Sequence, residues 1–222
     1  MSQQNPQSIQ NEAYEHIKRK IMMCEYAPNQ LLSEAVLLQE IGCSRTPVRE
    51  AIRRLEQEGL ATVLPKRGTI VSGFSVGDVN DIFEIRMLVE PYAIQTYGEQ
   101  LDPAELQRYL ELFRHPDSQK AQIDFYELDD EFHKYLHSAM TNKYLRDLYA
   151  RIHTQNVRLR VMSGQLIDQR LARTMEEHAE IAEACLSRDW TEASEKMRRH
   201  LECSRNSYFE AIVKNKSETN LM

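Results

Sequence analysis

The feature that most constrains this 222-residue chain is the stretch Cys43–Arg67, which reads CSRTPVREAIRRLEQEGLATVLPKR. Apolar residues recur in it at i, i+3, i+4 and i+7 and predict one buried helical stripe. They are Val48, Ala51, Ile52 and Leu55. Ser44 or Thr46 can cap this helix, and Pro47 fits its first turn. Gly59 can end it as a C′ glycine. The stretch therefore predicts a capped amphipathic helix.

A second face of this helix is basic. Arg45, Arg49 and Arg53 fall four residues apart on it, and Arg54 lies beside them. Guanidinium groups donate forked hydrogen bonds that suit guanine edges and phosphates. The pattern favours a helix that enters the major groove of DNA. The alternative is a small helical domain whose arginines are merely solvated, because i, i+4 arginines are common on exposed helices.

The residues around this helix supply the remaining parts of a winged helix-turn-helix. We predict a helix over 8–24, a short helix from the cap Ser33 to Ile41, the arginine helix, and strands over 61–64 and 69–71. Gly42 makes a tight turn between the second and third helices. The hairpin between the strands carries Lys66 and Arg67 at its tip, where they can reach the DNA backbone or minor groove. Together these features favour DNA binding over a solvated helical domain.

The charge of the chain is unevenly distributed. The formal net charge is −6, but residues 1–75 hold nine Lys and Arg against eight Asp and Glu. The other 147 residues hold nineteen basic and twenty-six acidic side chains, whereas 45–67 holds six basic and three acidic ones. A basic stripe on a near-neutral module that is attached to an acidic body predicts DNA binding by one end only.

Beyond a junction at 72–76 (SGFSV), the sequence pattern becomes helical. We predict helices over 77–97, 103–113, 119–140, 143–162, 167–187 and 189–214. Glycine and proline occur only seven times each, which disfavours a many-turned β architecture. The expected fold is mainly α: a winged helix-turn-helix with a small β-hairpin wing over 1–74, and an all-α antiparallel helical bundle over 75–222.

Three features bear on the cellular compartment. No apolar run approaches the roughly 20 residues of a membrane span. The polar, uncharged start MSQQNPQSIQ does not resemble a signal peptide. The four cysteines form no CxxC pair and are interpreted as reduced thiols. We therefore expect a cytoplasmic protein with no membrane partner.

Helical spacing directs several possible metal ligands towards the core of the bundle. Asp129 and His133 lie one turn apart on one predicted helix. His178 and His200 share faces with apolar residues on two later helices. Such donors can hold a divalent transition metal such as Zn, Ni or Mn. Each histidine can equally be an ordinary core residue, and His137 makes as good a pair with His133, so spacing alone leaves the ligand set open.

Arg86 lies on a predicted helix whose inward face is apolar. A buried arginine needs a counter-charge. In the ordinary interpretation, Glu90 at i+4 supplies it. The sharper hypothesis is a bidentate clamp on the carboxylate of a bound ligand. Asn156 and Arg160 are weaker candidates for the same effector-binding cavity.

The N-terminal residues resemble the winged helix of GntR-family bacterial regulators. The resemblance is carried by Leu32–Glu34, Ser44–Ala51 (SRTPVREA), Leu55–Glu56, Gly59–Leu60 and Arg67–Gly68. It implies that the recognition helix touches DNA through Arg45, Thr46 and Arg49, and the wing through Lys66, Arg67 and Gly68. Ser44 and Arg53 complete the candidate DNA-binding set. Asn29 stands where glycine is usual in this family, and asparagine also tolerates positive φ.

The later histidines resemble the FCD effector domain of the FadR branch of GntR regulators. The matching strings are D-x-x-F-H at 129–133, E-H at 177–178 and R-H-L at 199–201. The resemblance implies that the metal ligands are Asp129, His133, His178 and His200. It also implies that Arg86 can grip an acidic effector.

These observations predict a DNA-binding transcriptional regulator, most often a repressor in this family, and not an enzyme. We expect a homodimer on a palindromic double-stranded DNA operator, controlled by a small organic acid that completes the metal coordination. One alternative is a regulator for which the metal itself is the signal. A less favoured one is a metallo-hydrolase fused to a DNA-binding module, with Glu177 beside His178 as a candidate base.

Overall fold

The computed structural model divides the chain into two compact units. It describes residues 6–115, 122–163 and 168–219. The first unit comprises Met1–Ser75 and Gln155–Met162, and the second comprises Val76–Thr154 and Ser163–Met222. Residues 119–121 and 167, at the starts of two predicted helices, lie outside the described residues.

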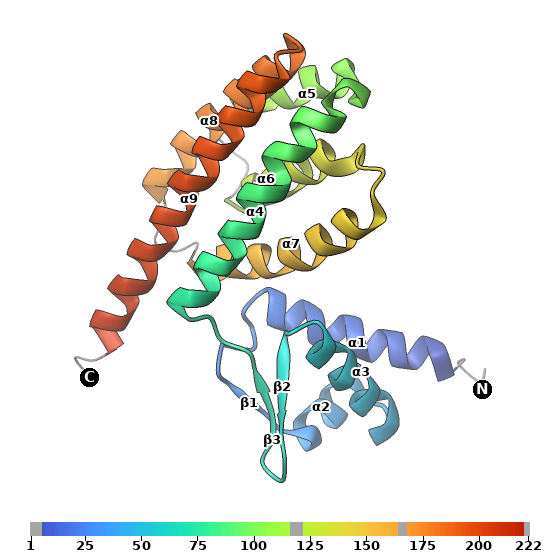
Figure 1. Ribbon diagram of the computed structural model, residues 1–222. Helices are drawn as coiled ribbons and strands as arrows, with labels where there is room; N and C mark the ends of the chain where they lie inside the picture. Colours follow the sequence, from blue (N-terminus) through green and yellow to red (C-terminus); the bar gives the residue numbers. More distant parts are fainter. Residues whose placement is uncertain (1–5, 116–121, 164–167, 220–222) are drawn as a thin grey trace. The chain divides into compact units, whose positions relative to one another are not determined.

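The first unit contains three helices and a small sheet (Figure 1). Its elements are α1 (Pro6–Met22), β1 (Leu31–Leu32), α2 (Glu34–Ile41), α3 (Arg45–Gln57), β2 (Ala61–Leu64) and β3 (Gly68–Val71). The predicted elements are confirmed, but the wing is not a simple hairpin. The strand order is β1-β3-β2, with Leu31 opposite Ile70. Strand β1 escaped prediction because two residues are too few to display an alternating pattern.

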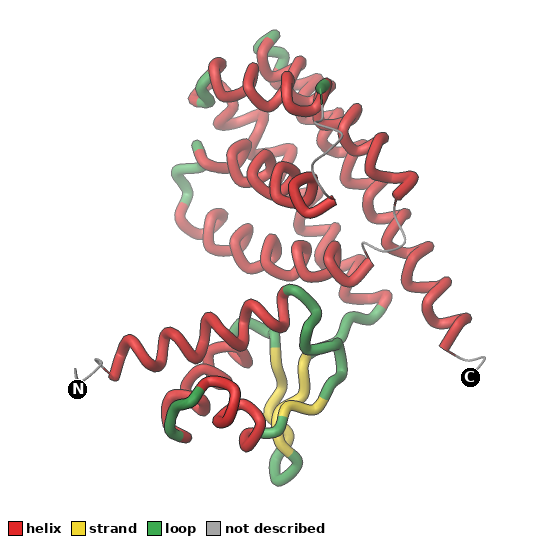
Figure 2. The backbone as a smooth tube through the Cα atoms, turned by 180° about the vertical axis from the view of Figure 1, so that it is seen from behind, coloured by secondary structure: helices red, strands yellow, loops and turns green. Residues whose placement is uncertain are grey.

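The apolar stripe of α3 holds that helix in the core of the first unit. Val48, Ala51, Ile52 and Leu55 are all buried. They share one cluster with Ala13 and Ile17 of α1, and α1 packs directly against α3. The three helices lie to one side of the sheet (Figure 2). Burial of each large aliphatic side chain is worth about 1.5–3 kcal/mol, so this stripe fixes which face of α3 meets solvent.

The turns of the first unit use backbone conformations that the sequence anticipates. Gly59 has φ +72° directly after the cap of α3, as expected for a C′ glycine. Asn29 has φ 65°, which confirms that asparagine replaces glycine there at positive φ. Ser44 occupies the N-cap position of α3, although its side chain makes no capping hydrogen bond.

The second unit is helical. Its elements are α4 (Val76–Tyr97), the 3-10 turn η1 (Gly98–Gln100), α5 (Pro103–Arg114), α6 (Gln122–Ser138), α7 (Lys143–Ser163), α8 (Asp168–Leu186) and α9 (Trp190–Thr219). The stretch Gln155–Met162 of α7 belongs to the first unit. Helix α4 lies along α9, while α8 packs against both α5 and α9 (Figure 1). The predicted all-helical architecture is confirmed.

Side-chain caps and one proline define the ends and the interior of these helices. Asp102 accepts a hydrogen bond from the amide of Ala104 at 2.9 Å, and Asn142 accepts one from Tyr144 at 3.0 Å. Both are the expected N-cap interaction. Pro91 lies inside α4 and cannot donate to the carbonyl four residues earlier. That carbonyl, on Met87, instead accepts from Nη1 of Arg198 at 3.5 Å.

In the described part of the chain, no helix combines the length and hydropathy needed to cross a membrane. The cysteines are free thiols, as predicted; they are Cys24, Cys43, Cys185 and Cys203. Only Cys185 is fully buried, and burial raises its pKa to about 12, so it behaves as a small apolar side chain.

Candidate nucleic-acid interface and metal centre

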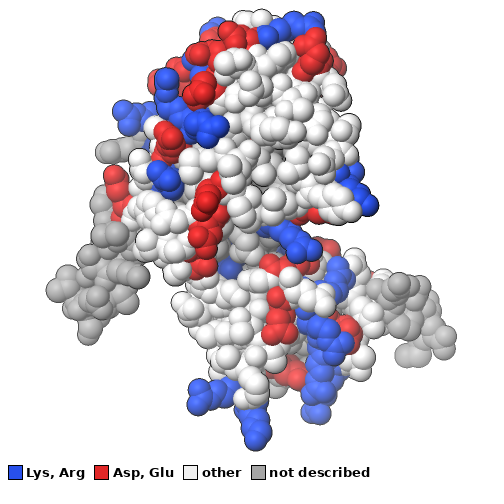
Figure 3. All heavy atoms as spheres, viewed as in Figure 1, with Lys and Arg blue, Asp and Glu red and all other residues white. Residues whose placement is uncertain are grey.

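Helix α3 presents a basic face to solvent. The side chains of Arg45, Arg49 and Arg53 are 75%, 63% and 67% exposed. Figure 3 shows Lys and Arg side chains over α3 and at the tip of the β2–β3 hairpin. Arg54 differs from the other three, because its guanidinium stacks 3.5 Å above the ring of Tyr14. Arg54 is therefore part of the packing between α1 and α3.

Acidic residues pair with the exposed arginines of α3. Glu34, at the start of α2, lies 3.1 Å from Nε of Arg49 and 3.7 Å from Nε of Arg45. Glu50 lies 3.0 Å from Nη1 of Arg53. Exposed pairs of this kind are worth about 0–1 kcal/mol and are screened by salt. Pairs of this strength orient the guanidinium groups and still allow them to exchange partners.

The β2–β3 hairpin presents its two cations on a tight turn. Leu64 pairs with Gly68, and the amide of Arg67 donates to the carbonyl of Leu64 at 3.0 Å. Lys66 has φ 63° and Gly68 has φ 111°, so the turn uses left-handed conformations at both positions. Lys66, Arg67 and Gly68 are exposed, as are Ser44 and Thr46. The structure thus leaves the predicted DNA-binding residues accessible to a partner.

Three histidines from three helices meet inside the second unit. His133 comes from α6, His178 from α8 and His200 from α9, and their exposed fractions are 3%, 0% and 3%. Their ring centroids are 4.6–5.3 Å apart. One possible ligand atom from each lies within 4.8 Å of the others. Among the described residues, this is the group whose geometry suits a metal ion.

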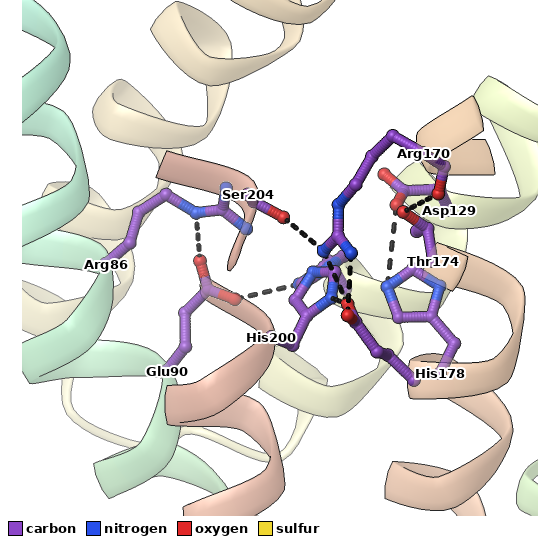
Figure 4. A network of polar contacts seen from close by, with 10 residues as sticks. Arg86, Glu90, Asp129, Arg170, Thr174, His178, His200 and Ser204 are labelled. Carbon is purple, nitrogen blue, oxygen red and sulfur yellow. Dashed lines mark hydrogen bonds and ion pairs between the residues drawn. The ribbon is translucent and has the colours of Figure 1, made fainter. Parts of the chain in front are cut away.

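Asp129 lies beside this group. Its Oδ1 is 3.5 Å from Nε2 of His178, and its side chain is buried (Figure 4). Asp129 and His133 share a face of α6 because they are one turn apart. An oxygen ligand next to three imidazoles is a donor set that suits a divalent transition metal.

His137, the competing partner for His133, lies outside the three-histidine group. Its ring stacks on Tyr149 with centroids 4.1 Å apart, and its Nδ1 contacts the carbonyl oxygen of His133. Its Nε2 lies 4.0 Å from Oε2 of Glu90. The structure therefore assembles His133 with His178 and His200, and places His137 against the wall formed by α7.

Arg86 is buried and pairs with Glu90. Its Nε lies 2.5 Å from Oε1 of Glu90, one helical turn away on α4. The other carboxylate oxygen, Oε2, lies 2.8 Å from Nδ1 of His133. Burial would raise the pKa of Glu90, but the charge of Arg86 and the hydrogen bond from His133 outweigh it and hold the pKa well below its usual value. Glu90 is therefore ionised and joins Arg86 to the histidine group (Figure 4).

A second carboxylate contacts the group from α8. Oε2 of Glu177 lies 2.7 Å from Nδ1 of His200. Arg170, two turns earlier on α8, donates to Oε1 and Oε2 of Glu177 at 2.6 and 2.5 Å. Burial would raise the pKa of Glu177, but the hydrogen bonds from His200 and Arg170 lower it. This carboxylate too is ionised.

Asn156 and Arg160, the weaker effector candidates, lie on α7. Both are buried, and both fall in the Gln155–Met162 stretch that belongs to the first unit. The clustered histidines all belong to the second unit. The participation of Asn156 and Arg160 in an effector site with Arg86 stays a prediction.

The sequence does not predict the contacts that Glu90 and Glu177 make with the histidine group, nor the pairing of Glu177 with Arg170. From the sequence, Glu90 is expected only as the partner of Arg86, and Glu177 only as a possible base beside His178. The pairing of Arg170 with Glu177 could have been predicted from spacing, because a separation of seven residues places both on the same helical face. The contacts with His133 and His200 cross between helices, and no local spacing indicates them.

The buried imidazoles predict a pH dependence in protein treated with a chelator. Burial lowers the pKa of His137 and of His200 from 6.5 to about 4. Between these values the unfolded chain binds protons that the folded chain does not, so stability falls as the pH falls. The expected slope is up to about 1.4 kcal/mol of unfolding free energy per pH unit for each group.

Urea unfolding followed by circular dichroism at pH 6.5 and pH 5 measures this slope. The His200→Gln variant is expected to show a shallower slope, because one of the two buried imidazoles is gone. An equal slope in the variant and the wild type would contradict the assignment to His200.

Comparisons with known proteins agree with this architecture. Residues 81–202 match the FCD domain family, and residues 9–71 match the bacterial regulatory proteins of the gntR family. The HTH-type transcriptional repressor RspR of Escherichia coli (strain K12) is 28% identical over 205 residues, which cover 90% of each chain. An uncharacterised HTH-type transcriptional regulator from Streptomyces ambofaciens is 34% identical over 135 residues, 60% of this chain and 57% of the relative.

The fold also has solved counterparts. A crystal structure described as a GntR transcriptional regulator from Rhodococcus sp. RHA1 superimposes with a TM-score of 0.75 at 20% identity. The match covers 92% of this chain and 99% of the other. Members of this family are transcriptional regulators rather than enzymes, so the metallo-hydrolase alternative is set aside. The chain belongs to the gntR family of bacterial regulatory proteins and is a DNA-binding transcriptional regulator with an FCD domain.

Proposed function

We propose that this regulator is a repressor that binds a palindromic operator as a homodimer and is controlled by a small carboxylate metabolite at a metal centre. The observation that carries the proposal is the group of three buried histidines with ligand atoms within 4.8 Å of one another. Relatives named as repressors support the direction of control.

The proposed metal ligands are His133, His178, His200 and Asp129. Imidazole nitrogens and one carboxylate oxygen suit Zn, Ni or Mn. Such an ion would supply a Lewis-acidic centre with positions left for a ligand carboxylate. Two of the histidines already have Nδ1 directed at a carboxylate, which leaves Nε2 to face the centre. The donor set of the described residues therefore fits a divalent ion.

The proposed effector is an organic acid that reaches Arg86. The guanidinium of Arg86 is held by Glu90, so an incoming carboxylate has to compete for it or share it. A bidentate carboxylate pair is the geometry in which a guanidinium binds most strongly. The open pocket of about 510 Å³ between α5 and α8 is a poor alternative for an acid. Three glutamates line it, namely Glu176, Glu180 and Glu183, against one cation, Arg114.

Operator binding is proposed to involve two copies of α3 in successive major grooves of an inverted repeat. Effector binding would change the relative placement of the two recognition helices and weaken the complex. The acid must bind one of the two conformations more tightly for this to work, since equal affinity shifts no equilibrium. If the operator binds equally well with the acid saturating, this mode of control is wrong.

Thermal-shift screening of metal-loaded protein against organic acids tests the effector site. An acid present at about 100 times its Kd is expected to add about 2.7 kcal/mol to the free energy of unfolding. The Arg86→Lys variant keeps the positive charge beside Glu90 but loses the planar fork, so its response should be much smaller. An equal response in both proteins would remove Arg86 from the effector site.

The second candidate is that the metal alone is the signal. The histidine group is almost completely buried, which also suits an ion that is bound as a regulatory ligand. Operator affinity would then follow the free metal concentration, and a chelator alone would switch the protein. Operator binding that is insensitive to chelation would exclude this candidate.

A further inference from the structure

The histidine group is held by two similar relays, each consisting of a glutamate and an arginine. In the first, Glu90 on α4 lies 2.8 Å from Nδ1 of His133 and 2.5 Å from Nε of Arg86. In the second, Glu177 on α8 lies 2.7 Å from Nδ1 of His200, and Arg170 donates to both of its oxygens. His133 and His200 thus each contact a glutamate of another helix, and an arginine holds each glutamate in turn.

An ionised carboxylate accepts hydrogen bonds and cannot donate one. The guanidinium of each relay is always protonated and so favours the ionised carboxylate. It follows that Nδ1 of His133 and of His200 carries the proton in the neutral ring. The lone pair available to a metal is then on Nε2 of each ring.

We propose that Glu90 and Glu177 are positioning residues, which fix the Nδ1–H tautomer of His133 and His200 and so present Nε2 to the metal. The proposal rests on the proposed metal centre. It adds that the two rings are set in their ligand tautomer and orientation before any ion binds. Carboxylate partners of this kind also make the ligand nitrogen more basic.

The two relays differ in their access to solvent. The side chain of Glu90 is 0% exposed and that of Arg86 6%, whereas Glu177 is 23% and Arg170 11% exposed. Removing the charge of Glu90 alone would take a counter-charge away from the buried Arg86, which is strongly destabilising. Replacing both members of a buried pair is far better tolerated. The test therefore changes Arg86 and Glu90 together.

The test compares Glu177→Gln and the double variant Arg86→Met/Glu90→Gln with the wild type. Glu105→Gln is the matched control, because Glu105 pairs with Arg108 on the surface of α5, away from the histidines. Zn²⁺ affinity is measured by competition with a chromogenic chelator. Each relay variant is expected to lose about 10- to 100-fold in affinity, and the control to lose none.

The second readout is the tautomer of each histidine in metal-free protein, read from long-range ¹⁵N NMR correlations. In the wild type, His133 and His200 are expected as the Nδ1–H form. Glutamine can both donate and accept, so it no longer selects one tautomer. The ring facing each substituted glutamate should then populate the Nε2–H form as well, a change that a merely structural contact would not produce.

Unchanged Zn²⁺ affinity with unchanged tautomers in both variants would overturn the proposal. If the wild type itself binds no metal, the proposed metal centre fails, while the tautomers still decide whether the glutamates fix the rings. If the double variant fails to fold, as judged by circular dichroism, the partly exposed Glu177→Gln relay decides the question alone.

Discussion

Replacing Arg49 by alanine is expected to lower the affinity for a specific operator about 5- to 150-fold, equivalent to about 1–3 kcal/mol. The side chain of Arg49 is 63% exposed and pairs with Glu34 at 3.1 Å, so truncating it removes no contact from the folded core. The loss therefore reports on DNA contacts. The operator is first selected from random DNA with the wild-type protein, and affinities are measured by fluorescence anisotropy at one fixed salt concentration.

Arg19→Ala is the matched control for this measurement. Arg19 lies near the end of α1, its side chain is 58% exposed, and it pairs with Glu25 at 2.8 Å. Both variants remove one exposed, ion-paired arginine from the same unit. If Arg49→Ala loses no more affinity than Arg19→Ala, α3 is not the recognition helix. A loss that is equal on the operator and on unrelated DNA would make Arg49 a phosphate contact without a part in reading bases.

Replacing His178 by glutamine is expected to lower Zn²⁺ affinity at least about 100-fold. Zinc sites with four protein ligands bind with about 10–16 kcal/mol of free energy, so one ligand accounts for roughly 3 kcal/mol or more. His178 is the fully buried member of the group, and water cannot easily take its place. Metal content after dialysis and chelator competition provide the measurement.

The effect of metal removal on the melting temperature is a second measurement on the same variant. A chelator is expected to lower the melting temperature of the wild type clearly and that of His178→Gln very little, because bound metal stabilises the folded state by mass action. His115→Gln is the control, since the side chain of His115 is 78% exposed at the end of α5. An equal chelator effect on His178→Gln and His115→Gln would show that the ion binds elsewhere.

The sequence predicts the basic face of α3 well because every signal for it is local. The apolar stripe and the basic stripe both follow from helical spacing within 13 residues, and burial of Val48 and Leu55 on one side leaves Arg45 and Arg49 on the other. Strand β1 is different, because it exists only through its pairing with β3. Two residues without a partner carry no pattern from which a strand can be read.

The metal group is predictable only in part. Helical spacing shows that His133, His178 and His200 face inward, and the structure confirms that each is buried. Spacing cannot choose between these residues and His137, which is also 3% exposed. The choice depends on how α8 and α9 are rotated against α6, a property of packing and not of any single helix.

The polar contacts around the three histidines are the part of the site that the sequence predicts least. The Arg86–Glu90 pair is predictable as an i+4 interaction, and the structure contains it. The contact of Glu90 with His133 joins residues 43 positions apart on two helices. Glu177 is adjacent to His178 in the chain but contacts His200, since neighbouring residues on a helix point about 100° apart.

Glu34 has a consequence for how the regulator searches a genome. If Arg45 and Arg49 contact DNA as proposed, each phosphate that approaches them must displace the carboxylate already placed against them. On random DNA, where phosphate contacts supply most of the binding free energy, this competition would shorten the lifetime of each complex. At the operator, hydrogen bonds to guanine edges would offset the cost of displacing the carboxylate. Breaking these exposed pairs would cost up to about 1 kcal/mol at every site, so Glu34 would shorten contacts with non-specific DNA.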